Sequence, residues 1–196
     1  MIGLDGYLAQ FKVRGRALVV GSKQYKGKAD RRTLYGEALG LDLEAGEGVD
    51  IIHDLEKPLP DTFGLFDHID CVSVLEHVQR PWLLCANIER AMADKATLLI
   101  SVPFVWRVHA YPSDYWRMTV EALPILFPGI KWLGRDYLSN GKHIVSRPHG
   151  ATIDGLTYMQ KTEVLAFGIR DINHKGNQTG SEGVFECHRN ATGQGV

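Results

Sequence analysis

One segment of the sequence, residues 103–119, is rich in side chains that can bind polar ligands or exchange protons. It carries two indoles, two phenols, two guanidinium groups, an imidazole and a carboxylate, on Trp106, Arg107, His109, Tyr111, Asp114, Tyr115, Trp116 and Arg117. Aromatic faces with a few polar groups can line a pocket for a polar ligand, and we expect this of Trp106, Tyr111, Trp116 and Arg117. Either His109 or Asp114 could accept a proton there.

The same segment also allows a structural interpretation. The run Pro112-Ser113-Asp114 can form a turn and a helix cap, and capping by Ser113 or Asp114 is expected in either case. Arg117 can pair with Asp114 three residues before it. Trp116 can belong to the core. The residue types alone leave both interpretations open.

The composition is that of a globular protein with one domain. The chain has 196 residues, of which 44% are hydrophobic, and its 22 basic and 23 acidic residues give a net charge of -1. This balance provides no general field for nucleic acid or an anionic membrane, so we expect neither as a partner. The oligomeric state is not readable from the sequence. The N-terminus lacks the pattern of a signal peptide and no apolar run is long enough to span a bilayer, so a cytoplasmic protein is expected.

The cysteine pattern and the C-terminal composition set two further expectations. The three cysteines have no paired spacing, so we expect neither a disulfide framework nor a metal site. Residues 171–196 are rich in Gly, Asn, Ser and Thr and poor in aliphatic side chains. We therefore expect one folded domain over residues 1–170 and an irregular or mobile tail over residues 171–196.

Short apolar runs alternate with helical patterns before this tail. Strands are expected at residues 17–21, 38–43, 49–53, 66–74, 97–102, 130–138 and 162–169, and helices at 30–36, 81–92 and 119–127. This alternation favours an α/β fold: a doubly wound, mostly parallel Rossmann-like sheet of about seven strands with helices on both faces. Ligands of such sheets bind beyond the carboxyl ends of the strands, at the point where the strand order reverses.

Small or acidic residues follow the first three expected strands. Gly21 would let the backbone approach a ligand closely. Asp42 comes about twenty residues after the first turn, where a carboxylate can hold a nucleotide ribose. Asp54 could accept a hydrogen bond from an adenine amine. Each residue also has an ordinary structural alternative, as a turn glycine or as a capping aspartate.

The fourth expected strand and the segments after it carry a family resemblance. Phe66-Asp67, the run Ser73-Val74-Leu75-Glu76-His77-Val78, a helix and the strand Leu99-Ile100-Ser101-Val102-Pro103 resemble the class I S-adenosylmethionine-dependent methyltransferases. The similarity is to the branch with a Leu-Glu-His turn after strand four. It extends from Arg16 to Phe127, and many members of this branch carry a stretch similar to residues 109–119.

The resemblance implies S-adenosyl-L-methionine as cofactor and a binding site made of strand ends. The implied cofactor contacts are Gly21, Ser22, Lys23, Asp42, Leu43, Asp54, Leu55, Ser73 and Val74. The first loop would face the methionine part and Asp42 the ribose hydroxyls, with Leu43 against the adenine. Asp54 and the backbone of Leu55 would bind the adenine, and the residues after strand four would lie below the sulfonium.

The resemblance also implies methyl transfer to an unidentified acceptor. A sulfonium methyl is already activated, so positioning of a small-molecule or glycan-like acceptor would dominate catalysis. For a hydroxyl acceptor a base is useful, and the candidates are His109 and Asp114, with His77 in reserve. As a structural alternative, both ring nitrogens of His77 could be satisfied within the fold.

The chain departs from the family pattern in its first loop. Val19 stands where the family has an acidic residue, and Lys23 replaces the second glycine. Lys23 could approach the methionine carboxylate or remain solvated. Two other functions therefore stay open: a catalytically silent S-adenosylmethionine-binding or scaffold protein of the same fold, and a nicotinamide-dependent oxidoreductase. The absence of a Gly-x-Gly-x-x-Gly fingerprint argues against the second.

Overall fold

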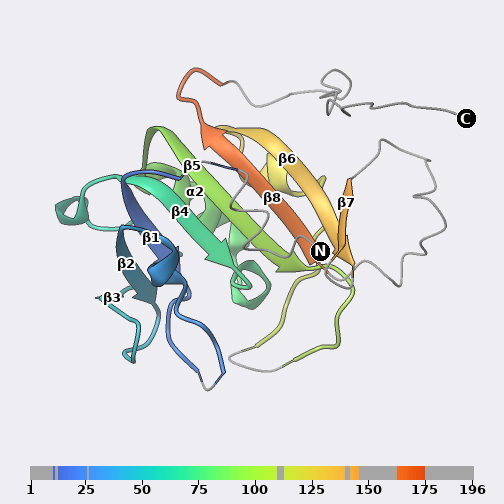
Figure 1. The fold of residues 1–196 in the computed structure, drawn as a ribbon, viewed down its shortest axis with the longest axis horizontal. Helices are drawn as coiled ribbons and strands as arrows, with labels where there is room; N and C mark the ends of the chain where they lie inside the picture. The colour runs from blue at the N-terminus through green and yellow to red at the C-terminus, as the bar shows by residue number, and fades with distance from the viewer. Residues whose placement is uncertain are drawn as a thin grey trace, which may run out of the picture.

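A single eight-stranded sheet forms the centre of the protein (Figure 1). The computed structural model describes residues 11, 13–25, 27–109, 113–139, 142–145 and 163–174. The strands, in chain order, are β1 (Arg16–Val20), β2 (Glu37–Asp42), β3 (Ile51–Ile52), β4 (Phe66–Val72), β5 (Met92–Pro103), β6 (Ile130–Ser139), β7 (Lys142–Val145) and β8 (Glu163–Arg170). Their order across the sheet is β3-β2-β1-β4-β5-β8-β6-β7.

The sheet is parallel from β3 to β5 and antiparallel beyond it. β8 pairs antiparallel with β5, β6 with β8, and β7 with β6. The chain runs outward from β1 through β2 to β3 and then returns to place β4 on the other side of β1. The order therefore reverses between β1 and β4, and this is where ligands of such sheets bind. The expected doubly wound, mostly parallel α/β fold is confirmed, and β7 is the strand that the sequence patterns missed.

Two α-helices and three short 3-10 helices are described. They are α2 (Pro81–Ala91), α3 (Leu123–Leu126), η1 (Arg31–Leu34), η2 (Asp61–Phe63) and η3 (Leu75–His77). The helix expected at residues 119–127 is wrong in its first half, where residues 120–122 form turns. Pro124 accounts for the late start, because a proline fits only the first turn of a helix. None of the described helices has the length and apolarity to cross a membrane.

Alternation along β5 directs two apolar clusters to opposite faces of the sheet. Leu98 and Ile100 belong to the larger cluster, which includes the buried side of α2, whereas Leu99 belongs to a smaller one with Phe167. In the view of Figure 1, α2 lies behind β4 and β5. Both described α-helices contact each other on this face. On the second face, the described cover is Phe11, which stacks on Phe167, and the segment of η1.

The expected tail begins close to the sheet. Of residues 171–196, only 171–174 are described, and Asp171 Oδ1 lies 3.2 Å from Lys95 Nζ, just before the central part of β5. The rest of the expected tail lies outside the described residues. The division into a domain and a tail thus remains a prediction.

A buried polar network holds η1 against the second face of the sheet. Arg31 Nη2 donates to Asp70 Oδ2 at 2.7 Å, and the Tyr35 hydroxyl also donates to Asp70. His68, which has no exposed surface, lies with Nδ1 2.8 Å from Thr97 Oγ1. Burial lowers the pKa of His68 to about 4, although the nearby Asp70 carboxylate acts in the opposite direction.

We predict that His68 makes the fold sensitive to acid. In the unfolded chain His68 regains an ordinary pKa of 6.5. Below pH 6.5 the unfolded state therefore binds the proton first, and stability falls as the pH drops towards 4. Between pH 7 and pH 5 the titration of His68 should lower the free energy of unfolding by about 2 kcal/mol. Urea unfolding of the wild type and of His68→Gln at both pH values measures the effect. The same pH dependence in both proteins would contradict the assignment.

Candidate functional site

The loops after β1 and β4 meet at the reversal point of the sheet. Gly21 has φ 69°, and its N–H donates to the Leu41 carbonyl at 2.8 Å. A Cβ on Gly21 would lie 2.6 Å from Val74 Cγ2, so only glycine fits this approach. Ser73, directly after β4, is exposed and has φ 55°, an unusual backbone conformation for serine. The structure therefore brings Gly21 against Val74, and Ser73 precedes Val74 in the same loop.

Asp42 anchors the first loop to the end of β2. Its carboxylate accepts hydrogen bonds from Lys23 N at 3.0 Å and from Glu44 N at 3.3 Å. The Lys23 ammonium donates to Glu44 Oε2 at 2.7 Å and so points to the surface. Leu43 follows with 60% of its surface exposed, which leaves an apolar face uncovered beside Asp42.

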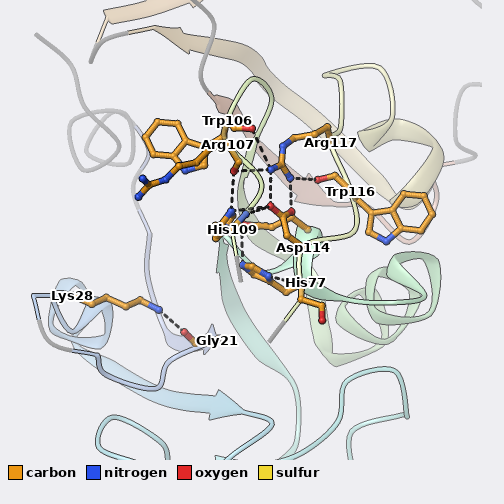
Figure 2. A network of polar contacts seen from close by, with 11 residues as sticks. Gly21, Lys28, His77, Trp106, Arg107, His109, Asp114, Trp116 and Arg117 are labelled. Carbon is orange, nitrogen blue, oxygen red and sulfur yellow. Dashed lines mark hydrogen bonds and ion pairs between the residues drawn. The ribbon is translucent and has the colours of Figure 1, made fainter. Parts of the chain in front are cut away.

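Lys28 is a cation at the first loop that the sequence analysis did not single out. Its Nζ donates to the Gly21 carbonyl at 2.8 Å (Figure 2). Burial lowers the pKa of Lys28, and the Asp42 carboxylate opposes that shift. No motif marks Lys28, because its position depends on the path of the loop between β1 and η1.

Asp54 and Leu55 have partners within the protein. The Asp54 carboxylate accepts a hydrogen bond from Glu56 N at 2.9 Å, which forms an Asx turn. Leu55 is buried in the core, and its carbonyl accepts from Asn87 Nδ2 at 3.0 Å. Their role at an adenine stays a prediction.

A second group of functional side chains gathers around Asp114, whose side chain is 1% exposed. Arg117 donates to both carboxylate oxygens, at 2.5 and 2.6 Å, so the expected ion pair is confirmed. The His109 backbone N–H donates to Oδ2 at 3.0 Å, and His109 Nδ1 lies 2.9 Å from the same atom (Figure 2). These partners hold the pKa of Asp114 far below its usual range. A carboxylate so satisfied is a weak base, and its geometry suits it to orient His109.

Helix capping by Ser113 or Asp114 is wrong. No helix follows them: residues 113–119 are irregular, because Asp114 bonds to the backbone of His109 and not to a following turn. The Ser113 carbonyl instead lies 2.7 Å from His77 Nδ1. Trp116 is partly exposed and donates through Nε1 to the Val78 carbonyl at 2.8 Å, so it is not a core residue.

Further hydrogen bonds join the loop after β5 to η3. Tyr115 N donates to the Glu76 carbonyl at 2.7 Å, and the rings of His77 and His109 meet edge to face at 4.9 Å between centroids. Trp106 is also exposed, on the same loop. Tyr111 lies outside the described residues. The structure thus brings His77, His109 and Asp114 into one cluster.

Glu76 is the residue of this cluster that the sequence analysis did not identify. Its side chain is 1% exposed, and neither carboxylate oxygen accepts a hydrogen bond from any described residue. His77 Nε2 lies 3.6 Å from Glu76 Oε1. Burial raises the pKa of Glu76 to about 7. The signal was present as the middle residue of Leu-Glu-His, but it served there only as a family marker.

Comparison with known proteins bears on the fold. No protein-family model matches the sequence, and no curated protein matches it either. Among solved structures, the N-methyltransferase NodS from Bradyrhizobium japonicum, in complex with S-adenosyl-L-homocysteine, is similar with a TM-score of 0.54 and 13% identity, over 83% of this chain and 81% of that chain. The 1,6-didemethyltoxoflavin-N1-methyltransferase from Burkholderia thailandensis has a TM-score of 0.56 and 14% identity, over 84% and 74%.

A third similar structure is named for another reaction. The [4+2]-cyclase SpnF has a TM-score of 0.60 and 14% identity, over 86% of this chain and 80% of that chain. The protein therefore has the fold of the class I S-adenosylmethionine-dependent methyltransferases. One fold can serve several activities, so the activity has to be argued from the residues of the site.

We predict that Gly21 is intolerant of a side chain for two separate reasons. Gly21→Ala adds both a left-handed backbone penalty and an overlap with Val74. Gly27, at φ 85° and with no atom within 4 Å of the place its Cβ would take, has only the first. Gly27→Ala should lower the free energy of unfolding by about 1 kcal/mol. Gly21→Ala should lower it by at least about 1 kcal/mol more. Urea unfolding of the two variants tests this, and equal losses would contradict it.

Proposed function

We propose that the protein binds S-adenosyl-L-methionine at the carboxyl ends of β1, β2 and β4 and transfers its methyl group to a small or polar acceptor. One observation carries the proposal. The close approach of Gly21 to Val74, with Asp42 beside it, lies at the reversal point of a sheet shared with methyltransferases that were solved with S-adenosylhomocysteine. Polar and small residues at that point are typical of a nucleotide site in this kind of sheet.

The described residues fit the cofactor in three chemical respects. Asp42 makes two hydrogen bonds to backbone N–H groups, which leaves carboxylate lone pairs for the hydroxyls of a ribose. Leu43 offers exposed apolar surface to an adenine ring. Lys28, at the Gly21 carbonyl, supplies a cation for the methionine carboxylate. Lys28 thus takes the role that the sequence suggested for Lys23, which pairs with Glu44.

The proposed acceptor site is the loop after β5. The cofactor supplies an activated methyl group, so the protein has to hold the acceptor in line and exclude water. His109 is the proposed proton acceptor. Its Nδ1 lies against the Asp114 carboxylate, which directs the free lone pair of a neutral ring to Nε2. The exposed indoles of Trp106 and Trp116 offer flat apolar surface for an acceptor.

A catalytically silent binding protein is the second candidate. It is favoured by the altered first loop, with Val19 and Lys23 in place of the acidic residue and the second glycine, and by a structural neighbour that is named as a cyclase. A nicotinamide enzyme has less support, because the loop after β1 lacks the glycine fingerprint of dinucleotide sites. Binding of S-adenosylhomocysteine and not of NAD separates this last candidate from the first two.

We predict that the ribose contact of Asp42 dominates cofactor affinity. Calorimetric titration with S-adenosylhomocysteine should show one site, and Asp42→Asn should weaken binding at least about tenfold, because a carboxylate accepts the bonds of a diol better than an amide. Asp61, an exposed residue in η2 before β4, gives the control variant Asp61→Asn. Its affinity should match the wild type. No binding by the wild type would refute the proposed function.

His109→Ala should separate turnover from cofactor binding. Release of S-adenosylhomocysteine over a panel of hydroxyl and amine acceptors should fall about a hundredfold or more, as expected for loss of a positioned base. The affinity for S-adenosylhomocysteine should stay within about twofold, because His109 lies on the loop after β5 and not on the Asp42 side. His174→Ala, beyond β8, is the control. An equal loss of turnover and affinity would show that His109 supports the fold of the site instead.

A further inference from the structure

Three potential metal ligands meet beneath the loop after β5. Glu76, His77 and His109 each offer one ligand atom, and these atoms lie within 4.8 Å of one another. No local spacing signals the set, since His109 follows His77 by 32 residues in the chain. The hydrogen bonds between η3 and residues 113–116 bring the two histidines together.

Both imidazoles are held in the orientation that metal ligands need. His77 Nδ1 lies 2.7 Å from the Ser113 carbonyl and His109 Nδ1 lies 2.9 Å from the Asp114 carboxylate. Both partners can only accept, so each Nδ1 carries the proton and each neutral ring has its lone pair on Nε2. A histidine that donates one ring N–H to a carbonyl or carboxylate while the other nitrogen binds metal is the usual arrangement around bound zinc.

The buried carboxylate of Glu76 supports the site independently of the two histidines. A carboxylate that is 1% exposed normally has hydrogen-bond partners, yet neither oxygen of Glu76 accepts one from the described residues. The guanidinium of Arg117, whose charge acts on Glu76, is already bound to both oxygens of Asp114. A buried carboxylate without hydrogen-bond partners, beside two imidazoles, is a set of donors that suits a divalent transition-metal cation.

We propose that Glu76, His77 and His109 bind a late first-row divalent cation, with Zn²⁺ as the reference ion. Two imidazoles and one carboxylate suit zinc and not Mg²⁺, which prefers oxygen ligands. Ligand atoms on tetrahedral zinc stand about 3.4 Å apart. The ligand atoms lie within 4.8 Å of one another, so side-chain rotations have to bring them closer by at most about 1.4 Å.

Three protein ligands leave the fourth position of zinc open. In zinc enzymes that position holds water or a substrate group, whose pKa the metal lowers. Here it would lie beside the acceptor loop, and this part of the inference rests on the proposed function. With the ion bound, His109 Nε2 would be a ligand and not a base. The metal would lower the pKa of an acceptor hydroxyl at the open position, and that hydroxyl would release its proton to solvent water.

Titration of the chelator-treated, untagged chain with ZnCl₂ alone tests the site. We expect one equivalent bound with a micromolar or lower Kd, and no binding of MgCl₂ at the same concentrations. Glu76→Gln and His109→Ala should each weaken Zn²⁺ binding at least about tenfold. His174→Ala should leave it unchanged. Thermal unfolding confirms that each variant is folded, and Glu76→Gln, which removes a buried charge, should be at least as stable as the wild type.

Absence of zinc binding, or binding that neither Glu76→Gln nor His109→Ala weakens, would overturn the proposal. Titration of the same proteins with S-adenosylhomocysteine keeps the two proposals apart. Zinc binding without S-adenosylhomocysteine binding would refute the proposed function and leave the metal site intact. S-adenosylhomocysteine binding without zinc binding would refute the metal site. It would keep the proposed function, with His109 as the proposed base.

Discussion

The hydrogen bonds of the Asp114 carboxylate hold together the part of the site that lies on the loop after β5. This carboxylate is almost inaccessible to solvent, and it stays ionised because Arg117 and the His109 backbone supply donors from two parts of one loop. Breaking such a buried pair on one side is costly, since the remaining charge has no partner. The described part of the loop after β5 has no regular secondary structure, so these side-chain contacts stabilise its conformation. They also fix the ring of His109 and, through Ser113, that of His77.

The part of the site at the ends of β1, β2 and β4 depends on the sheet itself. Because β1 lies between β2 and β4, the loop after β1 has to pass close to the loop after β4, and a glycine at position 21 makes that approach possible. Asp42 then ties the same loop to β2. The two groups of residues differ in chemistry: the loops after β1 and β2 offer a glycine turn, a carboxylate and a lysine, and the cluster around Asp114 offers imidazoles, a buried carboxylate and indoles. Such a division suits one ligand at the strand ends and a second beneath the loop, which is the arrangement that group transfer requires.

Much of the fold was predictable, because parallel strands are short continuous apolar runs and α2 has its apolar residues at helical spacing. The Asp114–Arg117 pair was also predictable, since both residues lie three apart. Most features that the sequence did not predict depend on contacts between residues distant in the sequence. The pairing of β7 requires β6, Lys28 reaches Gly21 only through a loop, and Glu76 and His109 meet only when η3 and the loop after β5 are packed. The late start of α3 is the exception, because Pro124 marks it within the local sequence.

A crystal structure of the protein with S-adenosylhomocysteine tests the central claim most directly. The account predicts that both ribose hydroxyls lie within hydrogen-bond distance of the Asp42 carboxylate, that the amino-acid part lies along the Gly21 turn near Lys28, and that the sulfur faces the cluster of Glu76, His77 and His109. A ligand bound elsewhere on the sheet, or one whose sulfur points away from His109, would contradict it.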